Sequence, residues 1–174
     1  MAAIGKYLKE KDPRARVVFI GPCTAKKMEF QRPEVHPYVD AVLTFEELQA
    51  LFDSRDIDLL SLDETALVDA SGFGRSFAHS GGLTGALRQA LAEQGKDDFD
   101  FKPVACDGID ACRVALLKAS KNLLEGNFIE GMACEGGCIG GAGCLTHTAR
   151  NKADVDRHAA AAVKKTLEES LAAL

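Results

Sequence analysis

A segment rich in cysteine and glycine constrains this 174-residue chain more than any other feature. Cys134 and Cys138 are four residues apart, and five glycines lie between Cys134 and Cys144. The segment follows an apolar run that predicts a strand. Thiolates bind soft metals and iron–sulfur clusters, and glycines let a backbone turn tightly around a bulky group. The segment therefore predicts a thiolate metal or cluster site on the turn after a strand.

Composition restricts the class of protein. Hydrophobic residues make up 47% of the chain, which allows a real core and argues against disorder. The net charge is −5 and no basic stripe is visible, so nucleic acid is not expected as a partner. No apolar run reaches membrane-spanning length, and no signal peptide opens the chain. With six cysteines and no secretion signal, we expect a reducing, cytoplasmic compartment without a membrane span.

Short apolar runs alternate with helical patterns, which predicts an α/β fold with a mostly parallel sheet flanked by helices. Four runs predict strands: 16–20, 40–43, 101–106 and 127–133. Six segments predict helices: the first nine residues, 24–30, 44–52, 81–95, about 107–126, and one from about residue 154. Residues 54–80 show no strong period and predict an irregular excursion. We expect 1–174 to form a single α/β domain.

Local signals add detail to three of these helices. Thr44 and Glu47 form a capping box. Asp107 is expected to cap the helix that follows it. The apolar stripes expected to face the core are Ile109, Cys112, Leu116 and Leu123 on that helix, and Val155, Ala159, Val163, Leu167 and Leu171 on the last one.

Cys23 is the natural third ligand beside Cys134 and Cys138. It follows the first predicted strand, and Cys134 follows the fourth. Ligands of parallel sheets bind beyond the carboxyl ends of the strands, so we expect both thiols at the same sheet edge. Cys23 also precedes a helix start, which favours a thiolate. Lys26 lies one turn further on and can direct its ammonium group at anything bound to Cys23, whereas Lys27 is expected to face solvent.

The other cysteines and the histidines give weaker signals. Cys112 is expected in the core, and Cys106 in core or loop packing. Cys144 is interpreted as a plain thiol or a spare ligand. The four histidines show no ligand spacing with the cysteines.

The two cysteine segments resemble those of the iron-only (di-iron) hydrogenases. The family motif Pro-Cys-x-x-Lys-x-x-Glu is matched by Pro22, Cys23, Lys26 and Glu29. The motif Glu-x-Met-Ala-Cys-x-Gly-Gly-Cys-x-x-Gly-Gly-Gly is matched at Glu130, Met132, Ala133, Cys134, Gly136, Gly137, Cys138, Gly141 and Gly143. Between them, residues 81–88 look like a helix start of the family. The resemblance spans roughly residues 1–150.

The resemblance implies a catalytic domain with Rossmann-like lobes and an H-cluster, which is a 4Fe-4S cubane joined to a di-iron unit. Cys23, Cys134 and Cys138 would be cluster ligands, with Cys138 bridging to the di-iron unit. Lys26 would hydrogen-bond a cyanide ligand, Glu29 would belong to the same cofactor-binding motif, and Met132 would pack against the di-iron unit. The reaction would be the reversible reduction of protons to hydrogen.

Departures from the family pattern imply an incomplete site. The motif Thr-Ser-Cys-Cys-Pro, which supplies the fourth cluster ligand and a proton-relay cysteine, is absent. Ala142, Cys144 and Leu145 replace the usual Gly, Gln and Pro. The chain therefore resembles the C-terminal portion of the catalytic domain. We expect it to be inactive and cluster-free alone, and to be completed by a missing N-terminal part or a further subunit. A ferredoxin-like protein would be the electron donor or acceptor.

Two other functions stay open at this point. The first is a non-catalytic iron–sulfur relative that acts in cluster assembly or sensing, and the second is a zinc-binding or interaction module. Lys26 and Met132 favour the hydrogenase, because both would serve the di-iron unit and not the cubane.

Overall fold

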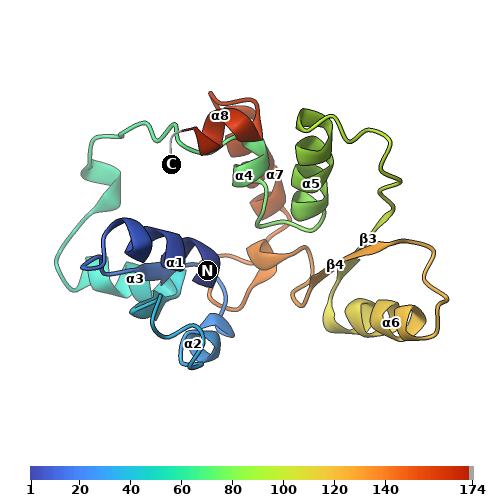
Figure 1. Ribbon diagram of the computed structural model, residues 1–174. Helices are drawn as coiled ribbons and strands as arrows, with labels where there is room; N and C mark the ends of the chain where they lie inside the picture. The colour runs from blue at the N-terminus through green and yellow to red at the C-terminus, as the bar shows by residue number, and fades with distance from the viewer. Residues whose placement is uncertain (173–174) are drawn as a thin grey trace. The chain divides into compact units, whose positions relative to one another are not determined.

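The computed structural model describes residues 1–172 of the chain (Figure 1). The last two residues of the predicted 1–174 domain lie outside that range. The described chain forms two compact units, one of residues 1–63 with 141–146, the other of residues 64–140 with the segment from 147 onward. The segment rich in cysteine and glycine is divided between them, because Cys134 and Cys138 belong to the second unit and Cys144 to the first.

The first unit contains a two-stranded parallel sheet. β1 (Val18–Ile20) pairs with β2 (Ala41–Leu43), with Val18 opposite Ala41 and Ile20 opposite Leu43. The helices in chain order are α1 (Ala2–Lys11), α2 (Lys26–Glu29), α3 (Phe45–Asp53) and the 3-10 helix η1 (Leu59–Ser61). Val35, Val39 and Val42 form the buried core of this unit, and Phe19, Phe30 and Tyr38 pack against it.

Asp40, the residue just before β2, contacts side chains and backbone of α1 and of the segment that leads into β1. Its carboxylate lies 2.8 Å from Lys9 Nζ, accepts the Val17 N–H at 2.7 Å and lies 3.2 Å from Arg16. These donors, Lys9 first, lower the pKa of Asp40 to about 2.

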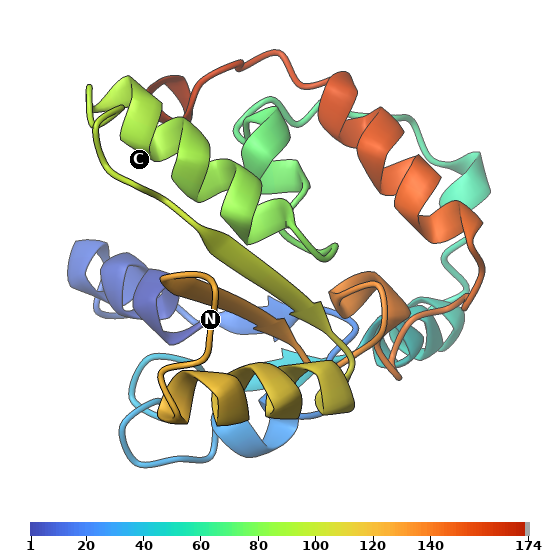
Figure 2. The same cartoon turned by 90° about the vertical axis from the view of Figure 1, so that its right-hand side faces the viewer.

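The second unit is built around a β–α–β motif. β3 (Pro103–Asp107) and β4 (Phe128–Met132) are parallel, with Asp107 opposite Met132. α6 (Ile109–Ser120) connects them and packs along both strands, as Figure 2 shows. The other helices of this unit are α4 (Gly72–Arg75), α5 (Gly82–Glu93), the 3-10 helix η2 (Cys138–Gly140), α7 (Arg150–Ala160) and α8 (Leu167–Leu171).

The α/β class, the four strands and their parallel pairing are confirmed, but not a single sheet. β1 with β2 and β3 with β4 form separate two-stranded sheets. The expectation that Cys23 and Cys134 lie at one edge of the same sheet is therefore wrong. Each thiol instead follows a strand of its own sheet, Cys23 after β1 and Cys134 after β4.

Helix ends confirm one predicted cap and overturn another. The Thr44 side chain accepts the Glu47 N–H, and the Glu47 side chain accepts the Thr44 N–H, so the capping box at α3 is confirmed. The expected cap by Asp107 is wrong. α6 starts after Gly108, which has a φ of 84°, without a side-chain cap. The Asp107 carboxylate instead accepts the Gly136 N–H at 2.8 Å.

The single helix predicted from residue 154 is wrong, because two helices replace it. α7 ends at Ala160, and α8 begins after Thr166 with a second capping box to Glu169. Glu93 at the end of α5 accepts the N–H groups of Leu167 and Glu168 at 2.9 and 3.0 Å. The local capping box and the long-range hydrogen bonds to Glu93 together start a new helix where the apolar period alone predicts continuation.

Large apolar side chains remain uncovered in both units. The stripe predicted to be buried on a helix over about 107–126 is exposed at Ile109 and Leu116 of α6 and at Leu123 beyond its end, and the buried residue of α6 is Ala115. Val18 and Ile20 of β1 are also exposed. A two-stranded sheet is marginal by itself, and exposed apolar patches of this kind mark contact surfaces. No helix among residues 1–172 has the length and apolar character needed to cross a membrane.

Candidate thiolate cluster site

The thiol loop, residues 133–140, begins where β4 ends. Met132 O accepts the Gly108 N–H at 2.9 Å, and Cys134 O accepts the Gly137 N–H at 3.0 Å, which closes a tight turn. Gly136 and Gly137 both have positive φ, 76° and 95°. A Cβ atom at residue 137 would also lie 2.6 Å from Ser80 N. Glycine is therefore required at 137 for both conformation and space.

The turn that precedes α5 holds this loop. Ser80 N–H donates to Gly136 O at 3.0 Å, and Ile139 N–H donates to Ala78 O at 3.1 Å, with an antiparallel bridge between His79 and Gly137. The loop therefore has a strand-like partner on one side. Cys134 and Cys138 are both half-buried, and the residues next to them make these backbone hydrogen bonds.

His79 connects the same turn to α7. Its Nδ1 lies 2.9 Å from Ser80 O, and its Nε2 lies 3.3 Å from Asp156 Oδ1. Lys152 lies 2.6 Å from the other oxygen of Asp156. The Lys152 ammonium, with a smaller contribution from His79, lowers the pKa of Asp156. The histidines show no ligand spacing in the sequence, so no role was predicted for them. The contact between His79 and Asp156 joins distant residues, and no spacing rule predicts it.

Cys23 lies in the first unit, on the turn after β1. Pro22 O accepts the Gly143 N–H at 3.0 Å, and Phe45 N–H donates to Gly143 O at 3.2 Å. A Cβ atom at residue 143 would lie 2.7 Å from Thr44 Cβ. The glycine run therefore has a second function, because Gly143 fits between the Cys23 turn and the start of α3. Cys23 is half-buried, and the neighbouring Cys144 is buried.

The two lysines after Cys23 make different contacts. Lys26 Nζ donates to Glu29 Oε2, so two residues of the same motif form an ion pair on α2. Lys27 is not simply solvated, contrary to the sequence expectation. Its Nζ donates to Val42 O at 3.1 Å and lies 2.7 Å from Glu47. The Lys27 ammonium lowers the pKa of Glu47.

Cys106 and Cys112 are packing residues at the end of β3 and on α6. Cys106 is buried, and this burial raises the pKa of its thiol. The Cys112 thiol lies 3.6 Å from Cys106 O and 3.5 Å from Met132 O. Core packing of Cys106 is confirmed, and Cys112 is half-buried beside it.

The predicted site residues divide between the units. Cys23, Lys26 and Glu29 belong to the first, and Met132, Cys134 and Cys138 to the second. Neither unit, over the residues described, gathers three His, Cys, Asp or Glu side chains that could hold a metal ion. Paired half-buried thiols on a glycine turn fit a soft metal or an iron–sulfur group. The two thiols of this loop are fewer than the four ligands that a cubane usually takes.

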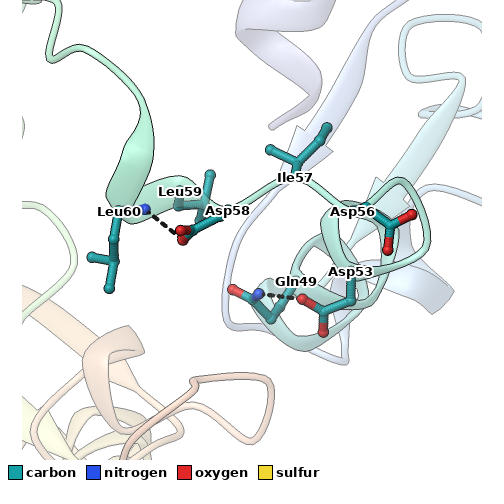
Figure 3. A pocket seen from close by; sticks show the side chains of 7 residues that line it. All are labelled: Gln49, Asp53, Asp56, Ile57, Asp58, Leu59 and Leu60. Carbon is teal, nitrogen blue, oxygen red and sulfur yellow. Dashed lines mark hydrogen bonds between the residues drawn. The ribbon is translucent and has the colours of Figure 1, made fainter.

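A hollow in the first unit lies away from Cys23 and has no thiol among its lining residues (Figure 3). It has a volume of about 690 Å³. Asp58 caps Leu60 N–H at 3.0 Å, and Gln49 donates to Asp53 at 2.8 Å, so two of its carboxylates already serve local structure. Its lining residues are Gln49, Asp53, Asp56, Ile57, Asp58, Leu59 and Leu60.

Comparison with known proteins defines the class. The family profile described as "Iron only hydrogenase large subunit, C-terminal domain" matches residues 1–142. Iron hydrogenase 1 of Clostridium pasteurianum is 31% identical over 159 residues, covering 72% of this chain and 28% of that protein. The periplasmic Fe hydrogenase large subunit of Nitratidesulfovibrio vulgaris is 31% identical over 166 residues, covering 76% of this chain and 39% of that protein.

Solved structures agree on the fold. A variant of the FeFe-hydrogenase HydA1 from Chlamydomonas reinhardtii matches with a TM-score of 0.58 at 19% identity, covering 99% of this chain and 62% of that one.

This chain therefore belongs to the iron-only hydrogenase large-subunit family. It corresponds to a C-terminal portion of that subunit and spans 28% and 39% of the lengths of the two curated relatives above. Members of this family are oxidoreductases, and the family implies iron–sulfur cofactors in the full-length protein.

Proposed function

We propose that this chain supplies three thiolate ligands, Cys23, Cys134 and Cys138, to the H-cluster of an iron-only hydrogenase. The thiol loop is the observation that carries the proposal. Two half-buried thiols lie on a turn whose backbone is hydrogen-bonded to residues 78–80. Gly137 occupies the position of this turn where a side chain would not fit. The bound cofactor would supply the redox chemistry that interconverts protons and hydrogen.

The other motif residues have roles that follow from their chemistry. Cys138 would hold the cofactor through its thiolate. Lys26 would present an ammonium donor to an anionic group of the cofactor, and Glu29 forms an ion pair with that ammonium on α2. Met132, half-buried at the end of β4, adds an apolar and polarisable wall.

A further polypeptide is proposed to complete the site. This chain offers three motif thiols where a cubane usually takes four ligands, and apolar faces on β1 and α6 remain uncovered. The missing part is proposed to be an N-terminal portion of the catalytic domain or a second subunit, without which the chain is inactive and cluster-free. In the complete protein we propose one domain over 1–174 with Rossmann-like lobes, a ferredoxin-like electron partner and a cytoplasmic location.

Anaerobic reconstitution with iron and sulfide tests this function in a complete hydrogenase that contains the chain. We expect cluster incorporation and hydrogen evolution, and we expect Cys138→Ser to abolish evolution. Cys106→Ser is the matched control and should retain it, because Cys106 is a buried residue of β3 that lies beside α6 and is not among the proposed ligands. Unchanged evolution in Cys138→Ser contradicts the proposal. Iron binding without any hydrogen chemistry supports the assembly or sensing alternative, and stoichiometric zinc without iron supports the zinc module.

A further inference from the structure

Glu130 is a deeply buried carboxyl group next to the candidate site. It lies on β4, four residues before Cys134, and is 2% exposed. One carboxylate oxygen accepts the Gly81 N–H at 3.0 Å, and the other accepts the Thr84 N–H at 2.9 Å. Both donors belong to the first turn of α5, where N–H groups lack helical partners and the helix dipole favours negative charge. Glu130 therefore caps α5 from a neighbouring strand.

The residues held by Glu130 continue directly into the turn that holds the thiol loop. Gly81 N–H binds Glu130, and the preceding Ser80 N–H binds Gly136 O in the loop. Ala78 O accepts the Ile139 N–H on the other side of Cys138. The start of α5 is thus bonded to β4 through Glu130, and to the backbone on both sides of Cys138 through residues 78–80.

We propose that Glu130 is a positioning residue for Cys134 and Cys138. Its carboxylate holds the start of α5 against β4, and the turn before α5 then holds the loop that carries both thiols. The cluster-binding consequence rests on the proposed function, whereas the effect on the loop does not. Removal of the carboxylate takes the acceptor from the buried Thr84 N–H and from the half-buried Gly81 N–H, and an unpaired buried donor is costly in a protein interior.

Site-resolved alkylation of the metal-free chain by iodoacetamide, followed by mass spectrometry, tests this role. In Glu130→Ala we expect alkylation of Cys134 and Cys138 to accelerate about tenfold, since the loop opens more often. Cys106 is the internal reference, because burial raises the pKa of its thiol and this residue of β3 lines a hollow together with residues of α6. Its rate should not change.

Two further variants separate positioning from general destabilisation. Glu130→Gln keeps one acceptor oxygen and should give an intermediate acceleration, and it carries the test if Glu130→Ala does not fold. Thr84→Val is the matched control, because it removes the buried Thr84 hydroxyl, which has no hydrogen-bond partner, and keeps the N–H that Glu130 binds. Its thiol rates should equal those of the unchanged chain.

The outcomes are distinguishable from a failure of the proposed function. Equal rates in the Glu130 variants and the unchanged chain, or an equal increase at Cys106, overturn the positioning role. A selective increase at Cys134 and Cys138 supports it whether or not the chain binds iron. If the increase is selective but the protein takes up no iron and sulfide, even within a complete hydrogenase, only the proposed function is contradicted.

Discussion

The two thiol-bearing regions of this protein are held in different ways. The loop of Cys134 and Cys138 is fixed by backbone hydrogen bonds to residues 78–80, with the buried Glu130 behind that turn. The Cys23 turn is fixed by a close glycine contact at Gly143, with partly exposed ion pairs of Lys26 and Lys27 on α2. Partly exposed ion pairs contribute little to stability and exchange partners readily. The loop of Cys134 and Cys138 is therefore preorganised, whereas the Cys23 turn can rearrange around a ligand.

The largest expected effect tests whether Cys23 belongs to the same site as the thiol loop. In a complete, reconstituted hydrogenase that contains this chain, Cys23→Ser should lower the bound iron per chain as strongly as Cys134→Ser does if, as proposed, each thiolate is a ligand of the same cubane. Iron analysis and electron paramagnetic resonance of the reduced protein measure this. Cys112→Ser is the control and should keep its iron. Normal iron in Cys23→Ser would restrict the site to the second unit.

Within the thiol loop, two neighbouring glycines separate backbone conformation from space. Gly137→Ala should destabilise the second unit by roughly 2–4 kcal/mol, since positive φ and a close approach to Ser80 both oppose a Cβ atom. Gly136→Ala should cost only about 1–2 kcal/mol, because its φ is also positive but no atom lies within 4 Å of its Cβ position. Urea unfolding measures both values. Equal costs would show that the contact with the 78–80 turn is loose.

The corresponding test in the first unit is Gly143→Ala. We expect a loss of roughly 1–3 kcal/mol, because the new Cβ would lie 2.7 Å from Thr44 Cβ and 3.3 Å from Pro22 O. Gly85→Ala on α5 is the matched control, since nothing lies within 4 Å of its Cβ position. It should stabilise the chain by about 0.5–1 kcal/mol through helix propensity. A neutral Gly143→Ala would contradict the close packing of the Cys23 turn.

Local patterns predicted the elements of this fold better than their assembly. The strands and the Thr44 capping box depend on residues near in sequence, and the structure agrees. Two small sheets in place of one could not be foreseen, because the alternation of strands and helices does not specify which strands are neighbours. The stripe on α6 was misjudged because periodicity identifies an apolar face and not whether another element covers it.

The candidate site shows the same limit. The cysteine motifs identify the thiols, but the contacts that hold them join residues distant in the chain, such as Glu130 with Gly81 and Pro22 with Gly143. Asp107 illustrates why. An aspartate before a helix is a common cap, yet here its carboxylate binds the Gly136 N–H of the thiol loop. Sequence position alone cannot choose between two available N–H donors.

The smallest expected effect concerns the exposed electrostatics of the first unit and depends on pH. Asp40 has a pKa of about 2 in the folded protein, below its ordinary value of 3.8, chiefly because of Lys9 and the Val17 N–H. Between these values the unfolded chain binds more protons than the folded protein. The contribution of Asp40 to the free energy of unfolding is therefore complete above pH 4 and disappears as the pH falls toward 2.

Asp40→Asn should therefore destabilise the chain slightly at pH 7 and progressively less below pH 4. Thermal unfolding at pH 7, 4 and 2.5 measures the difference. Asp12→Asn is the control, because the Asp12 side chain is exposed and contacts Arg14, two residues away. A constant difference for Asp40→Asn across this range would show that its hydrogen bonds act without its charge. The contrast between ion pairs in the first unit and backbone hydrogen bonds at the thiol loop would then weaken.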